Sequence, residues 1–236
     1  MEPLTPGTKV LQVQFSADYG FFRNPQTTMS PRTLPLPSPT AVRGMLGAIC
    51  GTPREQAPER FAAARLALQL TNPLRRQSIG INYLKTTSPK HFARFKEHKP
   101  TSVELLVKPA FRLFLAWDDT AAYEELKHML VNHLSVYTPC FGSSEYLANF
   151  RWIGEETVVS VAEKEAAIHT AVPRRAVKQL DYDCGEIFTT TLPVAMNNRR
   201  EVQRFETCVF ERNGEPLKGT FAEVTTLSSG AAIVFI

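Results

Sequence analysis

Residues 35–51 read PLPSPTAVRGMLGAICG and contain the start and stop signals of an amphipathic helix. Ser38 is of a residue type that caps helix N-termini, Pro39 suits the first helical position, and Gly51 is a typical C-terminal stop. Between these signals the apolar residues recur at the spacing of a single helix face: Val42, Met45, Leu46 and Ile49. We therefore expect a helix that begins at Pro39, ends at Gly51 and packs its apolar face on the core.

The same helix carries a second stripe made of small residues: Gly44, Gly47, Ala48 and Gly51. Each interior glycine costs a helix about 1 kcal/mol relative to alanine, so the stripe predicts that another segment approaches the helix backbone closely. Arg43, near the helix start, adds a cation to the positive end of the helix dipole, where an anionic phosphate could dock. The alternative is that Arg43 pairs with a carboxylate.

Strand and helix signals alternate outward from this helix. Apolar and polar residues alternate over 8–15, which predicts a half-buried strand, and the residues of 16–37 favour a loop. We further expect a short helix at 54–63, strands at 66–70, 77–84, 104–107 and 111–117, and a capped helix at 121–133. The order β-α-β-β-α-β is that of an α+β, ferredoxin-like domain of the RNA-recognition type with long insertions, whose sheet offers an open face for RNA.

The C-terminal third has a different pattern. Strands are expected at 186–192, 201–211 and 221–226, and Asn213-Gly214 is a strong signal for a hairpin turn. We therefore divide the chain into a ferredoxin-like domain over residues 1–162 and a small β-rich subdomain over residues 163–236.

The composition excludes several classes of protein. The chain has 236 residues, 43% of them hydrophobic, which indicates a globular protein, and no apolar run approaches the roughly 18 to 20 residues of a membrane span. The first residues do not resemble a secretory signal, so we expect a cytoplasmic protein with no membrane partner. The cysteines and histidines lack the spacing of metal ligands, and we expect neither a metal site nor a cofactor.

Positive charge is concentrated in one segment. The formal net charge is only +4, yet residues 75–112 hold nine Lys and Arg residues against two Glu residues. Tyr83, Phe92 and Phe95 lie between these cations. Alternating cations and aromatic rings suit single-stranded nucleic acid, because cations bind phosphates and rings stack on unpaired bases. The same composition is also compatible with a solvated surface loop.

Three segments resemble the fifth CRISPR-associated (Cas) protein family, RAMP-type subunits at the foot of type I Cascade complexes. Residues 35–51 are similar to its proline-rich approach and PTAxxGxLGAxxG helix, and residues 18–23, DYGFFR, match the aromatic and arginine patch that precedes them. Residues 139–148, PCFGSSEYLA, resemble its PxxGxSExLA segment. Residues 82–85, NYLK, with LLVKP at 105–109, are most like the type I-B branch. The resemblance covers about the first 150 residues, and the C-terminal third departs from it.

The resemblance implies a non-catalytic subunit that binds the 5′ handle of the guide RNA (crRNA) and caps the filament of backbone subunits in antiviral defence. Its partners would be that RNA, the backbone subunit, the large subunit and, through the complex, target DNA near the PAM-proximal end. A thumb-like insertion around 85–102 would contact RNA or a neighbouring subunit. The candidate RNA-binding residues are Phe21, Phe22, Arg23, Arg43, Gly44, Tyr83, Lys85, Lys90, Arg94, Lys96, Gly142 and Ser143.

Some of these residues have a structural interpretation too. Phe21 and Phe22 could stack on bases while Arg23 holds phosphate, but we expect at least one of the two phenylalanines to belong to the core. Gly142 and Ser143 could present backbone N–H groups and a hydroxyl to phosphate, or form an ordinary turn.

Two other functions remain open. The type I-C branch cuts repeat RNA without a metal, using a tyrosine, a lysine and a histidine, and the nearest candidates here are Tyr83, Lys85 and His91. However, no tyrosine lies between Tyr19 and Tyr83, so the ring that this branch uses before the small-residue helix is missing, and we prefer a binding role. The second alternative is a ferredoxin-like protein-interaction module that does not bind RNA.

Overall fold

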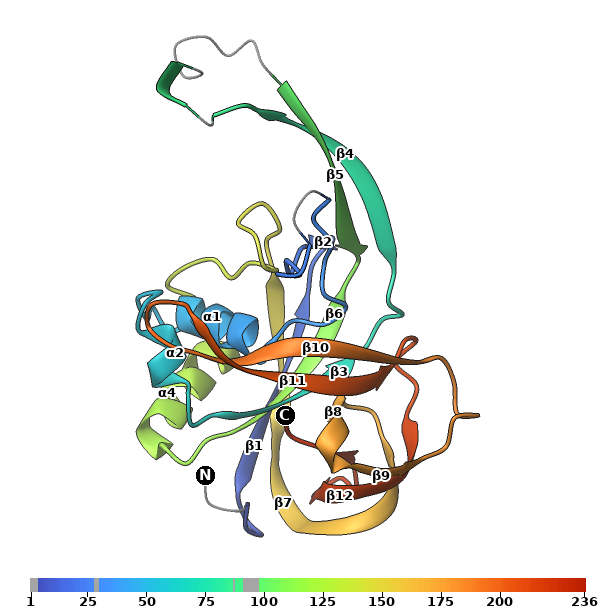
Figure 1. Cartoon of the computed structure of the whole chain (residues 1–236). Helices are drawn as coiled ribbons and strands as arrows, with labels where there is room; N and C mark the ends of the chain where they lie inside the picture. The colour runs from blue at the N-terminus through green and yellow to red at the C-terminus, as the bar shows by residue number, and fades with distance from the viewer. Residues whose placement is uncertain (1–3, 28–29, 87, 91–97) are drawn as a thin grey trace.

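The computed structural model describes residues 4–27, 30–86, 88–90 and 98–236, which form three β-sheets and a small group of helices (Figure 1). In chain order the elements are β1 (Lys9–Ser16), β2 (Tyr19–Gly20), α1 (Pro39–Ile49), α2 (Ala57–Arg60), β3 (Arg65–Leu70), β4 (Arg76–Leu84), β5 (His98–Val107), β6 (Ala110–Ala116), α4 (Thr120–Val131), β7 (Asn149–Ile168), β8 (Val172–Pro173), the 3-10 helix η1 (Arg174–Ala176), β9 (Val177–Leu180), β10 (Ile187–Met196), β11 (Val202–Glu211), β12 (Leu217–Leu227) and β13 (Ala232–Ile233).

The largest sheet has a ferredoxin-like arrangement at its centre. Its strands follow the order β13-β12-β7-β1-β6-β3, and each neighbouring pair is antiparallel. Strands β7, β1, β6 and β3, joined through α1 and α4, have the β-α-β-β-α-β connectivity expected from the sequence. The prediction of an α+β, ferredoxin-like fold is therefore confirmed.

Helix α1 begins and ends where its sequence predicts. The Ser38 side chain accepts a hydrogen bond from the Ala41 backbone N–H at 3.2 Å, and Gly51 follows the helix with a φ of +70°. The predicted apolar face is buried: Val42, Met45, Leu46 and Ile49. Helix α4 begins in the same way, because the Asp119 carboxylate accepts from the Ala122 N–H at 3.0 Å. Local sequence signals thus fix the two helices that cover the sheet.

The main core lies between these helices and one face of the sheet. It includes Leu46 of α1, Leu126 of α4 and Leu113 of β6. The β10–β11 hairpin also contributes to this core, through Leu192 and Phe210. The C-terminal third therefore completes the core of the ferredoxin-like part.

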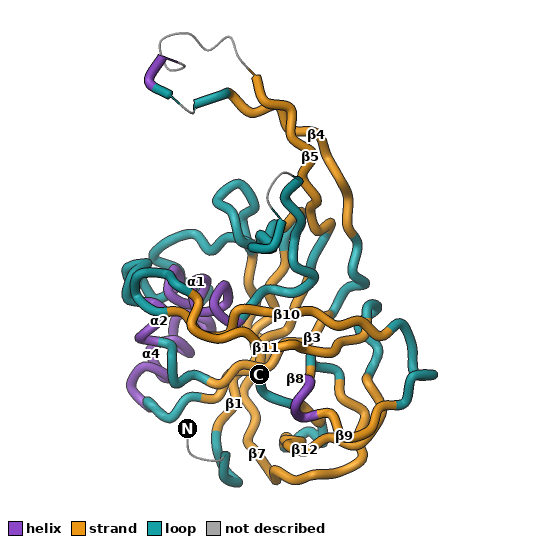
Figure 2. Tube along the Cα trace, viewed as in Figure 1, coloured by secondary structure: helices purple, strands orange, loops and turns teal. Residues whose placement is uncertain are grey.

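Strands β4 and β5, residues 76–84 and 98–107, form a two-stranded arm that projects from the body of the molecule (Figures 1 and 2). Their pairing runs from Arg76↔Leu106 at the base to Leu84↔His98, and β2 pairs with β5 at the base. We call these two strands the β4–β5 arm. The thumb-like insertion expected around 85–102 lies at their far end, residues 87 and 91–97 are outside the described residues, and its role stays a prediction.

The expected C-terminal strands are present as β10, β11 and β12, but the Asn213-Gly214 prediction was wrong. This turn joins β11 to β12, which lie in different sheets, so no hairpin forms across it. The Glu211 carboxylate organises the turn by accepting hydrogen bonds from the N–H groups of Asn213 at 2.6 Å and Glu215 at 2.9 Å. The proposed boundary after residue 162 falls within β7, and the division into two domains stays a prediction.

The sheet face opposite the helices is only partly covered. A small apolar cluster joins Phe114 and Ala67 of the sheet to Leu227 and Ile233 of the C-terminal segment. The polar residues Gln14, Gln69 and Arg112 on this face stay partly exposed. None of the helices in the described ranges is long and apolar enough to cross a membrane.

Candidate nucleic-acid interface

Three of the segments singled out in the sequence meet at the base of the β4–β5 arm. Tyr19 and Gly20 pair with Val107 and Leu106 of β5. Immediately after them, the Phe21 N–H donates to the Phe141 carbonyl at 2.9 Å. The aromatic patch at 18–23, the loop at 139–148 and the base of the arm therefore form one continuous surface region, which we call the arm base.

Gly142 is required by the backbone geometry of this region. Its φ is +88°, in the left-handed region that favours glycine. A Cβ atom at this position would collide with the Phe21 carbonyl. The glycine therefore allows the loop at 139–148 to lie directly against the aromatic patch.

The two phenylalanines of the patch face in opposite directions. Phe22 is buried, with its ring centroid 5.5 Å from that of Phe141 and 6.4 Å from that of Phe111. The prediction that Phe22 binds RNA was wrong, because a ring in the core cannot stack on a base. Phe21 is half-buried at the surface and Arg23 is exposed, and both stay candidates.

Tyr19 is a further candidate that the sequence analysis missed. Its side chain is 43% exposed on β2, beside the base of the arm. Side chains of an extended backbone alternate between two faces. Tyr19 and Phe21 accordingly lie on the outer face, and Gly20 and Phe22 lie on the inner face. This period of two could have identified Tyr19 as an accessible ring from the sequence.

The prediction that Arg43 binds phosphate was also wrong. Its guanidinium donates to three backbone carbonyls, those of Val194 at 2.6 Å, Phe61 at 2.9 Å and Ala64 at 3.4 Å. Burial, followed by the charge of Arg204, lowers the pKa of Arg43 to about 10. The alternative of a carboxylate partner was equally wrong for the part of the chain that the structure describes, where Arg43 forms no ion pair. Arg43 instead fastens α1 to β10 and to the segment before β3.

The small-residue stripe of α1 is explained largely by packing within the chain. A Cβ on Gly47 would come within 2.9 Å of Ala57 in α2, and one on Gly51 within 2.9 Å of Val136. The close approach predicted from the sequence therefore occurs at these two positions. Gly44 differs, since it is exposed with open space where a Cβ would lie, and it stays a candidate contact.

The loop at 139–148 carries a negative charge beside its candidate phosphate contacts. The Ser143 hydroxyl donates to the Glu145 carboxylate, and this bond, with a backbone hydrogen bond, lowers the pKa of Glu145. Burial raises the pKa of Tyr146, and negative charge on Glu145 and Tyr83 raises it further. The roles predicted for Gly142 and Ser143 stay predictions.

The far end of the arm carries exposed rings and cations. Tyr83 and Leu84 are each 47% exposed, Lys90 is exposed and Lys85 is half-buried. Arg94, Lys96 and His91 lie outside the described residues, and the catalytic alternative with Tyr83, Lys85 and His91 stays a prediction. In the part of the chain that the structure describes, no three His, Cys, Asp or Glu side chains are grouped as metal ligands would be.

A family profile described as CRISPR-associated protein (Cas5) matches residues 10–209, most of the chain. The chain belongs to this Cas5 family. The matched range includes α1, the arm, the loop at 139–148 and most of the β10–β11 hairpin. The family assignment expected from the three sequence segments is therefore confirmed, whereas the type I-B assignment stays a prediction.

Solved structures with a TM-score of 0.50 or more share this fold. A CRISPR protein from Archaeoglobus fulgidus is 13% identical, with a TM-score of 0.52 over 95% of this chain and 97% of that chain. A chain of the type III-B Cmr-beta complex bound to cognate target RNA is 11% identical, with a TM-score of 0.50 over 88% and 86%. A chain of a CRISPR RNA-guided surveillance complex is 14% identical, with a TM-score of 0.47 over 95% and 93%. No curated relative matches the sequence.

Proposed function

We propose that this Cas5-family chain is a non-catalytic subunit of a CRISPR effector complex. In this role it binds the 5′ handle of the crRNA and caps the filament of backbone subunits. Its further partners are the large subunit and, through the assembled complex, target DNA near the PAM-proximal end. Membership of the Cas5 family supports a place in CRISPR defence, and the arm with its base supports the choice of RNA as ligand.

The proposal rests mainly on the outer part of the β4–β5 arm, whose side chains are largely exposed. Most side chains of β4 are exposed, and within the described sheets β4 pairs with β5 alone. An isolated two-stranded ribbon is at best marginally stable in water. A partner that lies against the arm would stabilise it, and RNA or a neighbouring subunit fits a ribbon that carries both cations and rings.

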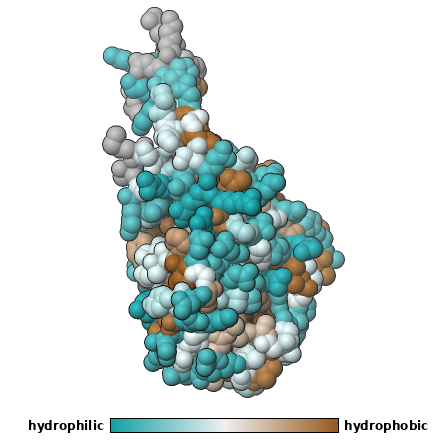
Figure 3. Space-filling model, turned by 90° about the vertical axis from the view of Figure 1, so that its right-hand side faces the viewer, coloured by the Kyte–Doolittle hydropathy of each residue, from teal (hydrophilic) through white to brown (hydrophobic). Residues whose placement is uncertain are grey.

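The charges at the arm base favour an anionic partner. Arg23, Arg75 and Lys108 are exposed, and among the described residues none of the three forms an ion pair. Tyr19 and Phe21 provide rings in the same region. From the side shown in Figure 3, the surface below the arm is mainly hydrophilic. Unpaired cations with accessible rings are the combination that binds the phosphates and bases of single-stranded RNA.

A salt series tests the proposal. We would measure by fluorescence anisotropy the Kd of the purified chain for a labelled single-stranded RNA that carries the repeat-derived 5′ segment of the host's own guide RNA. Each phosphate neutralised by a cation releases counterions, so the affinity should fall steeply between low and physiological salt. An affinity that stays flat over this range would overturn the proposal. An RNA with the same bases in permuted order separates recognition of the handle from general binding to single strands.

A further inference from the structure

The sheet face opposite the helices carries a polar row that crosses three strands. Arg112 of β6 lies in register with Gln14 of β1 on one side and with Gln69 of β3 on the other. Successive side chains of a strand point to opposite faces, and Phe111 and Leu113 occupy the core face. The row formed by Gln14, Arg112 and Gln69 therefore lies on the face that the helices leave open.

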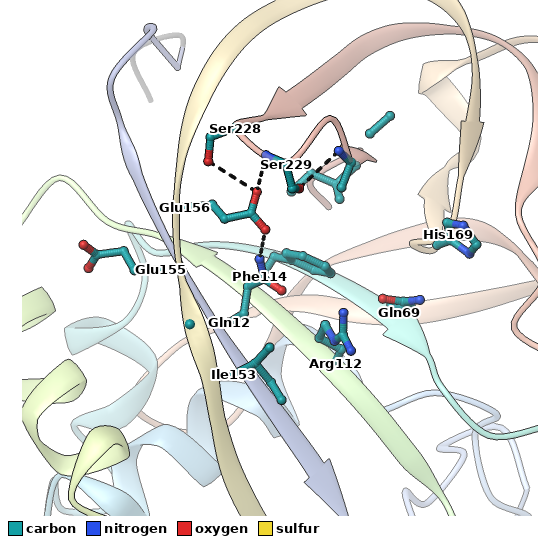
Figure 4. A pocket seen from close by; sticks show the side chains of 14 residues that line it. Gln12, Gln69, Arg112, Phe114, Ile153, Glu155, Glu156, His169, Ser228 and Ser229 are labelled. Carbon is teal, nitrogen blue, oxygen red and sulfur yellow. Dashed lines mark hydrogen bonds between the residues drawn. The ribbon is translucent and has the colours of Figure 1, made fainter.

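A hollow of about 800 Å³ opens over two members of this row, Arg112 and Gln69. Arg112, Gln69, Gln12 and His169 line it, and Figure 4 shows these side chains around a common space between the sheet and the C-terminal segment. Sites for small organic ligands measure roughly 300 to 1,000 Å³, so the hollow has room for one nucleotide.

Arg112 has no anionic partner among the residues that the structure describes. Its Nε atom is buried without a hydrogen-bond acceptor, and in the described ranges its guanidinium forms neither a hydrogen bond nor an ion pair. A partly buried guanidinium is costly unless its charge and its N–H groups are satisfied. The fold itself does not explain this residue, whereas an anionic ligand in the hollow would satisfy it.

The two carboxylates near the hollow are already engaged. Glu156 accepts from the Gln12 amide and from the Ser229 N–H. Glu155 points away from the hollow in Figure 4 and contacts Lys127 at 2.8 Å and Tyr123 at 2.9 Å on the helix side. Neither carboxylate therefore neutralises Arg112.

The hollow is connected to the arm base along β1. Gln12 lines the hollow, and Ser16, on the same face, lines a second hollow of about 420 Å³ with Asp18 and Lys108. Four residues of a strand span about 13 Å, which is a short distance for a chain of nucleotides. An RNA strand bound at the arm base can thus continue onto the open face.

We propose that the hollow binds one nucleotide of single-stranded RNA, with a phosphate on Arg112 and a base edge against the Gln69 amide and the His169 ring. This inference rests on the proposed function, since it extends the path of the same RNA from the arm base. The Gln69 amide is available for this role, because within the described structure its side chain forms no hydrogen bond. Amide and imidazole groups recognise the edges of unstacked bases.

The test compares the substitution Arg112→Met with Arg174→Met, which removes an exposed arginine of η1 on another part of the surface. The probe is the labelled single-stranded RNA described above, and both Kd and melting temperature are measured. We expect Arg112→Met to weaken RNA binding about tenfold. The slope of the logarithm of the binding constant against the logarithm of salt concentration should become shallower by about one, which corresponds to the loss of one phosphate contact. Arg174→Met should leave the affinity unchanged.

Stability distinguishes a binding residue from a structural one. Because the Arg112 guanidinium has no partner within the described ranges, Arg112→Met should not lower the melting temperature, whereas loss of a structural arginine would lower it. Arg112→Lys keeps the charge and should retain part of the affinity. If the wild-type chain binds RNA and Arg112→Met binds equally well, the open-face site is overturned while the proposed function stands. If the wild-type chain does not bind RNA, the proposed function fails and the open-face site fails with it.

Discussion

The β10–β11 hairpin and the β4–β5 arm are antiparallel ribbons of similar length, with 10 and 10 residues in one and 9 and 10 in the other. The two ribbons differ in how far their side chains are buried against the rest of the molecule. The first buries Leu192 and Phe210 in the main core, and Arg43 of α1 is bonded to the Val194 carbonyl. The second leaves Tyr83 and Leu84 about half exposed. The β10–β11 hairpin is therefore part of the folding unit, whereas the arm is available for a partner.

Truncation of the β10–β11 hairpin should have the largest effect. Replacing residues 192–206 by an Asn-Gly turn between Thr191 and Thr207 removes buried Leu192 and Val194 together with the acceptor for Arg43. Loss of each buried aliphatic side chain costs about 2 to 5 kcal/mol, so we expect the free energy of unfolding to fall by about 5 kcal/mol or more. Urea unfolding followed by circular dichroism measures this change. A truncated chain as stable as the wild type would show that the hairpin is not part of the folding unit.

The substitution Arg43→Met should destabilise the chain through the same attachment. It removes the hydrogen bonds to three carbonyls, and the acceptors Val194 and Phe61 lose a charged donor. We expect a loss of about 3 kcal/mol in the free energy of unfolding. Arg204→Met is the matched control, because removing the neighbouring charge should move the pKa of Arg43 back toward its usual value without destabilising the fold. Equal unfolding curves for Arg43→Met and the wild type would contradict the idea that the hydrogen bonds of Arg43 stabilise the attachment of α1 to β10.

Tyr83→Leu tests the arm with a smaller change. Stacking of one base on an aromatic ring is worth about 1 to 3 kcal/mol, so we expect RNA affinity to fall about tenfold while the melting temperature stays the same. Tyr182→Leu is the control, since Tyr182 is 73% exposed in the C-terminal third. Fluorescence anisotropy at one salt concentration gives the Kd of each variant for the RNA, and thermal unfolding gives its melting temperature. If the two substitutions had equal effects, a specific contact at Tyr83 would be excluded.

The smallest expected effect concerns catalysis. Repeat RNA incubated with the purified chain and a chelator should remain intact, in keeping with a binding role for the arm. Discrete fragments on a denaturing gel would favour the endoribonuclease alternative. If the fragments disappear when Tyr83, Lys85 and His91 are substituted together, the cleavage depends on these residues. If the fragments persist, the active site lies elsewhere.

Local features of the fold could be predicted from the sequence. Ser38, Pro39 and Gly51 act on their own helix, so their signals needed no knowledge of the rest of the chain. The Asn213-Gly214 prediction failed because turn chemistry does not determine which strands pair on either side of the turn. Instead, β11 pairs with β10 and β12 with β7. Pairing partners are set by burial across the whole molecule.

The candidate site was only partly predictable for the same reason. The resemblance supplied the segments at 18–23 and 139–148 as candidates, and only the structure shows that they meet at the base of the arm. Arg43 was misassigned because its acceptors come from distant parts of the chain, including Val194. Phe21 and Phe22 differ only in the face that they occupy, which depends on the neighbouring Phe141.

Truncation of the β4–β5 arm tests the proposed role most directly. Replacing residues 80–102 by an Asn-Gly turn between Ile79 and Val103 removes the exposed part of the ribbon and keeps its buried base. The truncated chain should keep the wild-type melting temperature and lose about 100-fold in affinity for the single-stranded RNA, because several cations and an accessible ring are removed together. A folded, truncated chain that binds this RNA as tightly as the wild type would contradict the role of the arm in RNA binding.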